Sequence, residues 1–158
     1  MTTINYYTYQ SYESLFGNII IVSNGKAITN ITLESNINPG CNKEANELTN
    51  KAAEQLSEYF NNKRKNFDIP LDPCGSEFQR KVWQALREIP YGQTRSYKQV
   101  AQMIDNPNAC RAVGLANNKN PIWIMIPCHR VIGSDGKLVG YGGGLEMKQR
   151  LLEIESNK

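Results

Sequence analysis

Cys128 and His129 are the two residues of this sequence whose types and spacing could support nucleophilic chemistry. They lie side by side in the run PCHR (127–130), directly after the apolar run IWIMI (122–126). A thiol reacts as its thiolate, and a nearby imidazole can lower the thiol pKa or accept the thiol proton. A buried and unreactive cysteine is the alternative interpretation. The polar residues after Cys128 and the glycine-rich run 140–144 favour a reactive cysteine with room for a ligand.

The other reactive side chains exclude several common kinds of site. His129 is the single histidine of the chain. The four cysteines, which contain no C-x-x-C pair, are Cys41, Cys74, Cys110 and Cys128. This spacing is not that of a disulfide scaffold, and a zinc site with about four nitrogen or sulfur ligands would have to use both Cys128 and His129. A cysteine hydrolase would need a base held by a third group and an oxyanion hole. It is disfavoured because the single histidine is the immediate neighbour of the cysteine. We therefore expect no metal ion and no cofactor.

Composition and charge indicate a folded chain that can meet a polyanion. The chain has 158 residues, of which 40% are hydrophobic and 21% charged, as in one globular domain or two small ones. No apolar run reaches the roughly 18 residues that span a membrane, and residues 1–10 lack the features of a signal peptide, so we expect a cytoplasmic protein. The net charge of +3 is uneven, because residues 74–158 carry twelve Lys/Arg against seven Asp/Glu. Such a basic half suits nucleic acid, or it is a solvated helix surface.

The first part of the chain has the pattern of a small sheet followed by a helix. Three β-rich runs are residues 4–9, 18–23 and 26–33. The dipeptide Asn24-Gly25 between the second and third runs is a strong hairpin signal. Apolar residues then repeat every three or four positions over residues 42–60, which predicts a helix. The polar segment 61–73 carries two prolines and is the predicted linker, with a short strand at residues 67–69.

The second part of the chain has the pattern of short helices. The predicted helices cover residues 76–89, 96–104, 108–116 and 145–155. Ser76 and Gln79 fit a capping box at the start of the first helix, and Pro90 ends that helix. The turn at residues 105–107 joins two short helices in the basic part of the chain, which resembles a helix-turn-helix. We therefore predict two domains, at residues 1–72 and 73–158.

The predicted helix from residue 108 carries one long cation, Arg111, among small residues such as Ala112 and Gly114. Small side chains allow close helix packing in a core, which is one interpretation. The other is close approach to a nucleic-acid groove, because a minor groove about 6 Å wide admits a helix only when it is widened. A helix that reads the major groove would carry larger polar side chains.

These motifs resemble those of a known family. Residues 75–155 are similar to the C-terminal domain of the O6-alkylguanine-DNA alkyltransferases, the methylated-DNA–protein-cysteine methyltransferases, in their stand-alone form. The matching stretches, in order, are Phe78-Gln79, Val82-Trp83, Ile89-Pro90-Tyr91-Gly92, Thr94, Ser96-Tyr97, Arg111-Ala112-Val113-Gly114, Ala116-Asn117, Asn120-Pro121, Ile126-Pro127-Cys128-His129-Arg130-Val131, Gly140-Tyr141 and Gly143-Gly144. The resemblance implies an α+β fold, with an N-terminal ribonuclease H-like α/β domain containing a small antiparallel sheet and a C-terminal all-α domain with a helix-turn-helix.

The resemblance implies a DNA repair reaction in which the Cys128 thiolate takes an alkyl group from O6 of guanine, and it leaves open whether O4-alkylthymine is also accepted. His129, working through a water with Glu155, would take the thiol proton. Tyr97 would donate a hydrogen bond to the leaving guanine, and Asn120 would hold the turn before the active site. The damaged nucleotide must be rotated out of the duplex, because a thiol cannot reach O6 of a stacked base in line. The product is a thioether, so each molecule would act once.

The resemblance also implies the surfaces that bind DNA and the damaged base. The implied DNA-binding residues are Thr94, Arg95, Ser96, Arg111, Ala112 and Gly114. Arg111 would fill the gap that the rotated nucleotide leaves in the duplex. The residues implied to contact the base are Tyr97, Val131, Tyr141, Gly142 and Gly143. The expected partner is double-stranded DNA containing O6-alkylguanine, bound through its minor groove by a monomer, with no membrane involved.

Two positions depart from the family pattern. Asp105 stands where glycine is common in the turn between the two helices, and aspartate tolerates a left-handed backbone better than most residues. Gly142 stands where relatives often have a small polar residue, which would leave a roomier pocket.

The family's zinc sites use N-terminal cysteine and histidine residues, and this chain has no histidine there. The alternative functions are a non-enzymatic sensor of alkylated DNA, whose known forms lack the acceptor cysteine, and a plain helix-turn-helix regulator.

Overall fold

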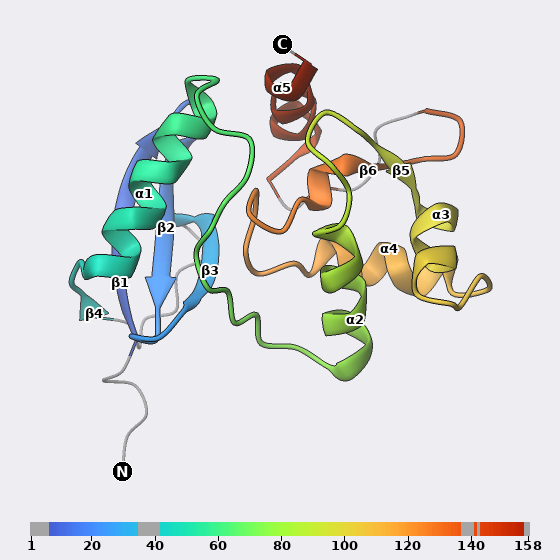
Figure 1. The fold of residues 1–158 in the computed structure, drawn as a ribbon, viewed down its shortest axis with the longest axis horizontal. Coiled ribbons are helices and arrows are strands. Elements are labelled where there is room, and N and C mark those ends of the chain that lie inside the picture. Colours follow the sequence, from blue (N-terminus) through green and yellow to red (C-terminus); the bar gives the residue numbers. More distant parts are fainter. Residues whose placement is uncertain (1–6, 35–41, 137–140, 142, 157–158) are drawn as a thin grey trace. The chain divides into compact units, whose positions relative to one another are not determined.

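The computed structural model describes residues 7–34, 42–136, 141 and 143–156, and its elements are drawn in Figure 1. The chain divides into two compact units, Met1–Pro73 and Cys74–Lys158. Within the described residues, the first unit is a sheet with one α-helix, and the second consists mainly of helices. No helix within the described ranges has both the length and the apolar character that crossing a membrane requires.

A four-stranded sheet forms most of the first unit. Its strands are β1 (Thr8–Ser14), β2 (Gly17–Ser23), β3 (Ile28–Leu33) and β4 (Asn42–Lys43), in the spatial order β3-β2-β1-β4. The pairs β1–β2 and β2–β3 are antiparallel, whereas β4 lies parallel to β1. Helix α1 (Glu47–Phe60) lies along this sheet (Figure 1). The buried core of the unit includes Ile19, Ile21, Leu56 and Tyr59.

The hairpin predicted at Asn24-Gly25 is confirmed. Strands β2 and β3 pair as antiparallel neighbours on either side of it. Gly25 has a φ of +92°, a left-handed conformation that glycine adopts without steric cost. The side-chain oxygen of Asn24 accepts hydrogen bonds from the N–H groups of Lys26 and Ala27, both 2.9 Å long. The two residue types that predicted the turn are therefore the ones that hold it.

Strand β1 lies later in the sequence than predicted. The sequence predicts residues 4–9, of which residues 4–6 lie outside the described part of the chain. The strand begins at Thr8 and continues to Ser14, because its backbone pairs along its whole length with β2. The later residues are mostly polar, so they carry no apolar signal that would extend the prediction. Pairing with a neighbouring strand sets the limits of β1.

Helix α1 also begins later than predicted, at Glu47 rather than at residue 42. The side chain of Asn46 accepts a hydrogen bond from the Thr49 N–H at 2.9 Å. The Thr49 hydroxyl accepts one from the Asn46 N–H at 2.8 Å, so the two residues complete a capping box. The residues before the cap, Asn42 and Lys43, form β4 instead. A side-chain cap thus overrides the apolar periodicity at the start of this helix.

The segment 61–73 is not a free linker. The strand predicted at residues 67–69 is absent, and Leu71 instead forms an isolated bridge with Ile28 of β3. Ile69 is buried, so the segment packs as part of the first unit. Its prolines and charges suggested exposure, but backbone hydrogen bonds attach it to β3, from the Ile28 N–H to the Pro70 carbonyl at 2.9 Å and from the Asp72 N–H to the Ile28 carbonyl at 2.8 Å.

Helices dominate the second unit. Its elements are α2 (Glu77–Leu86), β5 (Arg95–Ser96), α3 (Tyr97–Met103), α4 (Cys110–Asn118), the 3₁₀ helix η3 (Cys128–Arg130), β6 (Val131–Ile132) and α5 (Leu145–Ser156). Strands β5 and β6 pair in parallel, which adds a minimal ladder to the predicted all-α domain. Buried residues of its core include Val82, Leu86, Val100, Val113 and Leu151. The indole N–H of Trp83 donates to the Ala116 carbonyl at 2.8 Å and so ties α2 to α4.

Local sequence signals set several element limits in the second unit. Helices α2 and α3 begin with capping boxes at Ser76 and Ser96. Helix α2 ends at Leu86, four residues before Pro90, because hydrogen bonds of the i to i+3 type tighten the chain into a turn there. The turn between α3 and α4 contains Asp105 at a φ of +57°, the left-handed conformation expected for it. Helices α3 and α4 therefore form the predicted helix-turn-helix.

Candidate active site

The chain that leads into Cys128 is held in a tight and buried turn. Asn120 braces this turn, because its Nδ2 donates to the Ile126 carbonyl at 2.8 Å and its Oδ1 accepts from the Ile122 N–H at 2.9 Å. The indole N–H of Trp123 donates to the Asn120 carbonyl at 3.1 Å. These residues are all buried. The turn therefore has little freedom, and it fixes where Cys128 begins.

Ile124 adopts a strained backbone conformation at the tip of this turn. Its φ is +74°, and the Met125 N–H donates to the Trp123 carbonyl across it at 2.8 Å, which is the pattern of a γ-turn. A residue held in a sparsely populated region of this kind costs on the order of 1–3 kcal/mol. The hydrogen bonds of Asn120 must outweigh that cost. The sequence predicts only a buried apolar run here, because apolar residues carry no signal for such a turn.

Cys128 is the first residue of η3, and 2% of its surface is exposed. Its N–H donates to the Ile126 carbonyl at 2.8 Å. Burial raises the pKa of the Cys128 thiol to about 11, against the opposing effects of Asn120, Lys148 and Tyr141. A thiol with this pKa is protonated at neutral pH, so its reaction requires a group that removes the proton.

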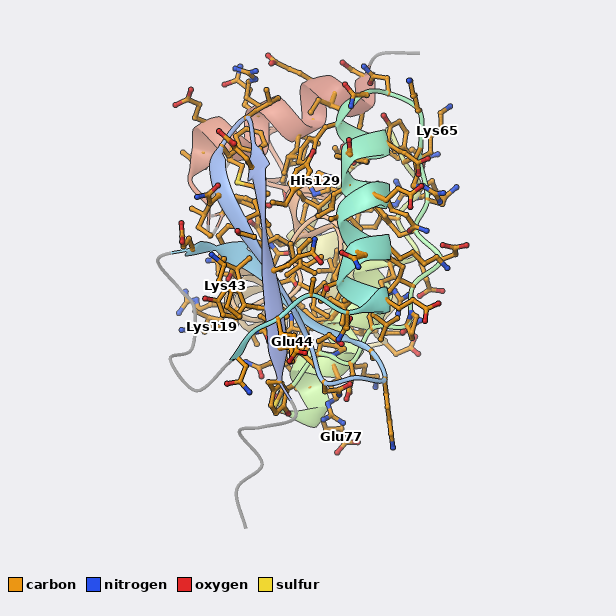
Figure 2. The ribbon with its side chains drawn as sticks, turned by 90° about the vertical axis from the view of Figure 1, so that its left-hand side faces the viewer. Lys43, Glu44, Lys65, Glu77, Lys119 and His129 are labelled. Atoms are coloured by element: carbon orange, nitrogen blue, oxygen red, sulfur yellow. The ribbon has the colours of Figure 1, made fainter. Side chains whose placement is uncertain are left out.

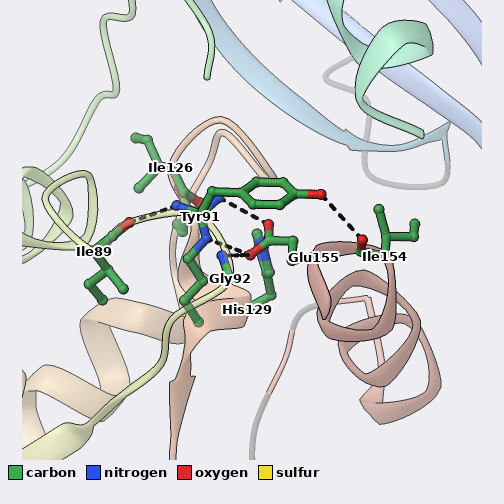
Figure 3. A network of polar contacts seen from close by, with 9 residues as sticks. Ile89, Tyr91, Gly92, Ile126, His129, Ile154 and Glu155 are labelled. Carbon is green, nitrogen blue, oxygen red and sulfur yellow. Dashed lines mark hydrogen bonds and ion pairs between the residues drawn. The ribbon is translucent and has the colours of Figure 1, made fainter. Parts of the chain in front are cut away.

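His129, Arg130 and Glu155 form a buried polar network next to Cys128 in the chain (Figure 3). Nε2 of His129 lies 2.6 Å from Oε2 of Glu155. Arg130 donates through Nε to Oε1 of the same carboxylate at 2.8 Å and through Nη2 to Oε2 at 3.0 Å. Its Nη1 donates to the Ile89 carbonyl at 2.7 Å. The network therefore ties α5, η3 and the end of the α2 segment together.

This network sets the protonation state of His129. Burial would raise the pKa of Glu155, but the hydrogen bonds and charges of His129 and Arg130 outweigh it and hold that pKa well below its usual range. Glu155 is then an ionised acceptor, so Nε2 of His129 carries the hydrogen between them. Burial lowers the pKa of His129, which leaves the ring neutral with Nδ1 as its proton acceptor. Nδ1 is buried and has no hydrogen-bond partner among the described residues.

The structure brings the predicted pair His129 and Glu155 into direct contact, so no water is needed between these two side chains. His129 is fully buried, whereas Glu77 and Lys119 of the same unit, which are also labelled in Figure 2, are exposed. Sequence reasoning missed the part of Arg130 in this network. Its position directly after His129 was the only signal, and a basic residue there also fits a solvated surface.

Lys148 is a second site residue that sequence reasoning missed. Its side chain is fully buried on α5, and burial lowers its pKa to about 8. Its Nζ lies 6.0 Å from the centroid of the Tyr97 ring, and its charge lowers the pKa of Cys128. A signal was present in the sequence, because Lys148 precedes Glu155 by seven residues. Two helical turns place both side chains on the same face of α5.

Asn117 links helix α4 to the reactive cysteine and was also missed. Its Nδ2 donates to the Cys128 carbonyl at 3.3 Å, and the residue is buried. Its Oδ1 is buried without a hydrogen-bond partner among the described residues. A polar residue on the buried side of a helix is the signal that could have identified it, because buried polar groups are nearly always held by a hydrogen bond.

The structure describes four of the five residues predicted to contact the base, namely Tyr97, Val131, Tyr141 and Gly143. Gly142, the fifth, lies outside the described residues. The Tyr141 ring packs 5.7 Å from the Trp123 ring, measured between centroids. Gly143 lies against both rings, because a Cβ there would lie 3.0 Å from Cε2 of Tyr141 and 3.2 Å from Cζ3 of Trp123. An aromatic wall therefore borders the predicted base site.

Three of the residues predicted to bind DNA lie on α4. Arg111 and Ala112 are exposed, and Gly114 is half-buried. A Cβ at Gly114 would lie 3.8 Å from Cδ1 of Tyr97, an ordinary contact distance, so the packing of the described residues does not require glycine there. The buried side of the helix consists of Val113, Ala116 and Asn117.

The other three predicted DNA-binding residues lie in and before β5. Thr94 is exposed. Arg95 donates to the Thr94 carbonyl at 2.9 Å and to Oε1 of Gln93 at 3.0 Å. The Ser96 hydroxyl accepts a hydrogen bond from the Gln99 N–H at 3.1 Å and caps α3. Arg95 and Ser96 are therefore engaged in local structure.

Comparisons with known proteins cover both units. Residues 77–157 match the family model described as 6-O-methylguanine DNA methyltransferase, DNA binding domain, and residues 6–73 match its ribonuclease-like domain. The chain is 49% identical over 153 residues to the methylated-DNA–protein-cysteine methyltransferase of Methanosarcina barkeri, which covers 94% of this chain and 97% of that one. It is 47% identical over 153 residues to the protein of the same name from Mycobacterium leprae, with 94% and 92% covered. The crystal structure of Mycobacterium tuberculosis OGT in complex with DNA aligns with a TM-score of 0.89 at 43% identity, over 94% of this chain and 92% of that one.

Proposed function

The chain belongs to the methylated-DNA–protein-cysteine methyltransferase family, and from that membership we propose how its own residues carry out the repair reaction. Its activity is the transfer of an alkyl group from O6 of guanine in DNA to a cysteine of the protein itself. We assign Cys128 as that cysteine. One observation carries the assignment: a buried thiol directly precedes a neutral histidine whose Nε2 is held by Glu155 and whose Nδ1 can accept a proton.

The first step of the proposed mechanism removes the proton from the Cys128 thiol. His129 accepts this proton at Nδ1 through one bridging water, and Glu155 stabilises the imidazolium that forms. The Lys148 ammonium stabilises the thiolate, because opposite charges in a buried site interact more strongly than in water. This step is necessary because the raised pKa of the Cys128 thiol would otherwise leave almost no thiolate at neutral pH.

The second step transfers the alkyl group. The thiolate sulfur attacks the alkyl carbon in line with the C–O bond, so that a C–S bond forms as the bond to O6 breaks. The electron pair of the broken bond stays on the guanine oxygen, and the Tyr97 hydroxyl supplies a hydrogen bond that stabilises this leaving group. The product is a thioether, which none of these residues can cleave. Each protein molecule therefore acts once.

The target base reaches Cys128 by rotation out of the duplex. Helix α4 enters the minor groove, where its small residues Ala112 and Gly114 allow close approach. Arg111 is exposed on α4 and fills the space that the rotated nucleotide leaves. Asn120 keeps the turn before Cys128 fixed while the base enters. The protein acts as a monomer, since the second unit of one chain supplies both the DNA-binding surface and the acceptor cysteine.

The test is a stoichiometric reaction with a duplex that contains one O6-methylguanine. We expect at most one methyl group per protein molecule, and peptide mass mapping places it on the peptide of Cys128. The matched control is Cys110→Ala, because Cys110 is an exposed thiol of the same unit and this variant should transfer normally. Cys128→Ser should bind the duplex and leave the methyl group on guanine.

Two results would contradict the proposal. A methyl group on Cys110 or Cys74 rather than on Cys128 would show that an exposed thiol is the acceptor. Binding of the damaged duplex with no methyl group on any cysteine would indicate the sensor function instead.

A further inference from the structure

Leu115 is a large apolar side chain that lies exposed on helix α4. Of its surface, 65% is exposed, the highest value among the large apolar residues that the structure describes. The other exposed residues of this helix are small or polar, and Arg111 is the one long side chain among them. A single exposed leucine is common in folded proteins. Its place on the helix therefore decides whether it has a function.

Leu115 projects from the same side of α4 as Arg111. Residues four positions apart on an α-helix differ by about 40° in direction and by about 6 Å along the axis. The buried side of the helix is formed by Val113, Ala116 and Asn117, which define the opposite direction. Both exposed side chains thus point away from the core of the second unit.

We propose that Leu115 is a further positioning residue of the DNA-binding surface, where it acts as an apolar wedge against the minor-groove wall one helical turn from Arg111. This inference rests on the proposed function, in which α4 enters the minor groove. A minor groove about 6 Å wide does not admit a helix. Proteins that widen this groove commonly do so with apolar side chains such as leucine.

The charges around Leu115 favour DNA as its partner over another protein. Arg111 precedes it on α4 and Lys119 follows the helix, and both are exposed. Residues 74–158 carry twelve basic against seven acidic residues. One leucine between two cations fits a groove that has apolar sugar walls and phosphate edges. It does not fit the larger apolar patch that a protein partner requires.

The test compares Leu115→Ala and Leu115→Met with the unchanged chain. The matched control is Leu15→Ala, because Leu15 is 64% exposed and lies in the first unit, in the turn between β1 and β2. Three quantities are measured. They are the dissociation constant for an undamaged duplex over a series of salt concentrations, the single-turnover transfer rate from a duplex with O6-methylguanine, and the transfer rate from free O6-methylguanine base.

We expect Leu115→Ala to weaken duplex binding by about 5- to 10-fold, since part of a leucine side chain loses its burial. Transfer from the duplex should slow by a similar factor at low protein concentration. The slope of affinity against salt should stay the same, because leucine carries no charge. Leu115→Met should keep at least half of the affinity, and Leu15→Ala should bind as the unchanged chain does. Transfer from the free base should be the same in every variant.

Unchanged duplex affinity in Leu115→Ala would overturn the inference. An equal loss with the free base would also overturn it, because the substitution would then act on the Cys128 site. Failure of the unchanged chain to take a methyl group from any substrate would instead overturn the proposed function, so the two ideas fail separately.

Discussion

His129 is prepared to accept a proton in the resting protein. Its Nε2 hydrogen is committed to the Glu155 carboxylate, and Arg130 keeps that carboxylate ionised. The remaining ring nitrogen, Nδ1, is therefore the basic one. Because each protein molecule reacts once, the site needs neither a second base nor a proton donor to return His129 to its starting state.

The first prediction concerns the pH dependence of stability. The pKa of His129 is lowered in the folded protein, so below about pH 6.5 the unfolded chain binds a proton that the folded chain does not. The free energy of unfolding should therefore fall between about pH 7.5 and about pH 5.5, by at most about 1.4 kcal/mol. Urea unfolding at several pH values measures this change.

The matched variant for this prediction is His129→Gln. His129 is the single histidine of the chain, so this variant should have a nearly flat stability over the same pH range. Stability of the unchanged chain that rises on acidification would mean that the sign of the pKa shift is wrong.

A second prediction at the residue scale concerns Lys148. Lys148→Met removes the positive charge that lowers the pKa of Cys128, so transfer at neutral pH should slow by about tenfold if the thiol pKa rises by about one unit. Raising the pH should restore much of the rate. Stability should not fall, because burial disfavours the charged form of this lysine, as its lowered pKa shows.

Lys81→Met serves as the control, since Lys81 is an exposed lysine on α2. Quench-flow transfer assays across pH give the rates, and urea unfolding gives the stability. A Lys148→Met variant with the normal rate at neutral pH would remove Lys148 from the mechanism.

At the scale of elements, the turn at residues 120–126 carries the strain of the site. The backbone of Ile124 is strained in the turn that leads to Cys128 at the start of η3, and the side chain of Asn120 holds this turn. The γ-turn depends on Asn120, because the side-chain hydrogen bonds of Asn120 hold the residues on both sides of Ile124. Loss of the brace should release the turn.

The third prediction tests this brace. Asn120→Ala leaves the Ile122 N–H buried without a partner and removes one of the two hydrogen bonds to the Ile126 carbonyl, which should lower the free energy of unfolding by about 2–4 kcal/mol. Asn118→Ala is the control, because Asn118 is exposed at the end of α4 and should change stability by less than about 0.5 kcal/mol. Chemical denaturation compares them. Equal stabilities would show that the brace contributes nothing.

The fourth prediction separates folding from DNA contact in α4. The space at Gly114 accepts a Cβ, so Gly114→Ala should raise stability by about 0.5–1 kcal/mol through helix propensity. The same methyl group should hinder close approach to DNA and slow transfer from a duplex. Thermal unfolding and single-turnover transfer would show opposite signs. A variant that is stabilised and fully active would mean that DNA does not approach this position.

The elements of the second unit were more predictable than its active site. Capping boxes at Ser76 and Ser96 and the turn at Asp105 are local, so the sequence within a few residues decides them. The γ-turn at Ile124 and the start of β1 depend on partners elsewhere in the chain. Local patterns cannot express such partners. Lys148 is different, because its seven-residue spacing from Glu155 is visible in the sequence, whereas its burial beside Tyr97 is visible only in the structure.

On the scale of the whole molecule, charge separates the two units. Residues 1–73 carry six basic against eight acidic residues, whereas residues 74–158 carry twelve against seven. The sequence alone was sufficient to identify the second unit as the basic one, because counting charges requires no structure. Duplex affinity should fall with rising salt as the second unit releases counterions from the phosphates.

The fifth prediction places this salt dependence on one unit. Lys98→Ala removes an exposed cation of α3 next to Tyr97, and it should make the slope of log affinity against log salt shallower by about one if Lys98 contacts a phosphate. Lys26→Ala removes an exposed cation of the first unit and should leave the slope unchanged. Fluorescence anisotropy with an undamaged duplex measures both slopes. A larger effect of Lys26→Ala would place DNA on the first unit.

The burial of Cys128 has a consequence for how long each molecule stays useful. Among the three cysteines that the structure describes, Cys74 and Cys110 are exposed and Cys128 is buried with a raised pKa. Oxidants and small electrophiles in the cell react with exposed thiolates first. A protein that is consumed by one reaction is lost whenever its acceptor meets the wrong reagent. Burial of the Cys128 sulfur until a damaged guanine reaches it keeps unreacted protein molecules available for DNA repair.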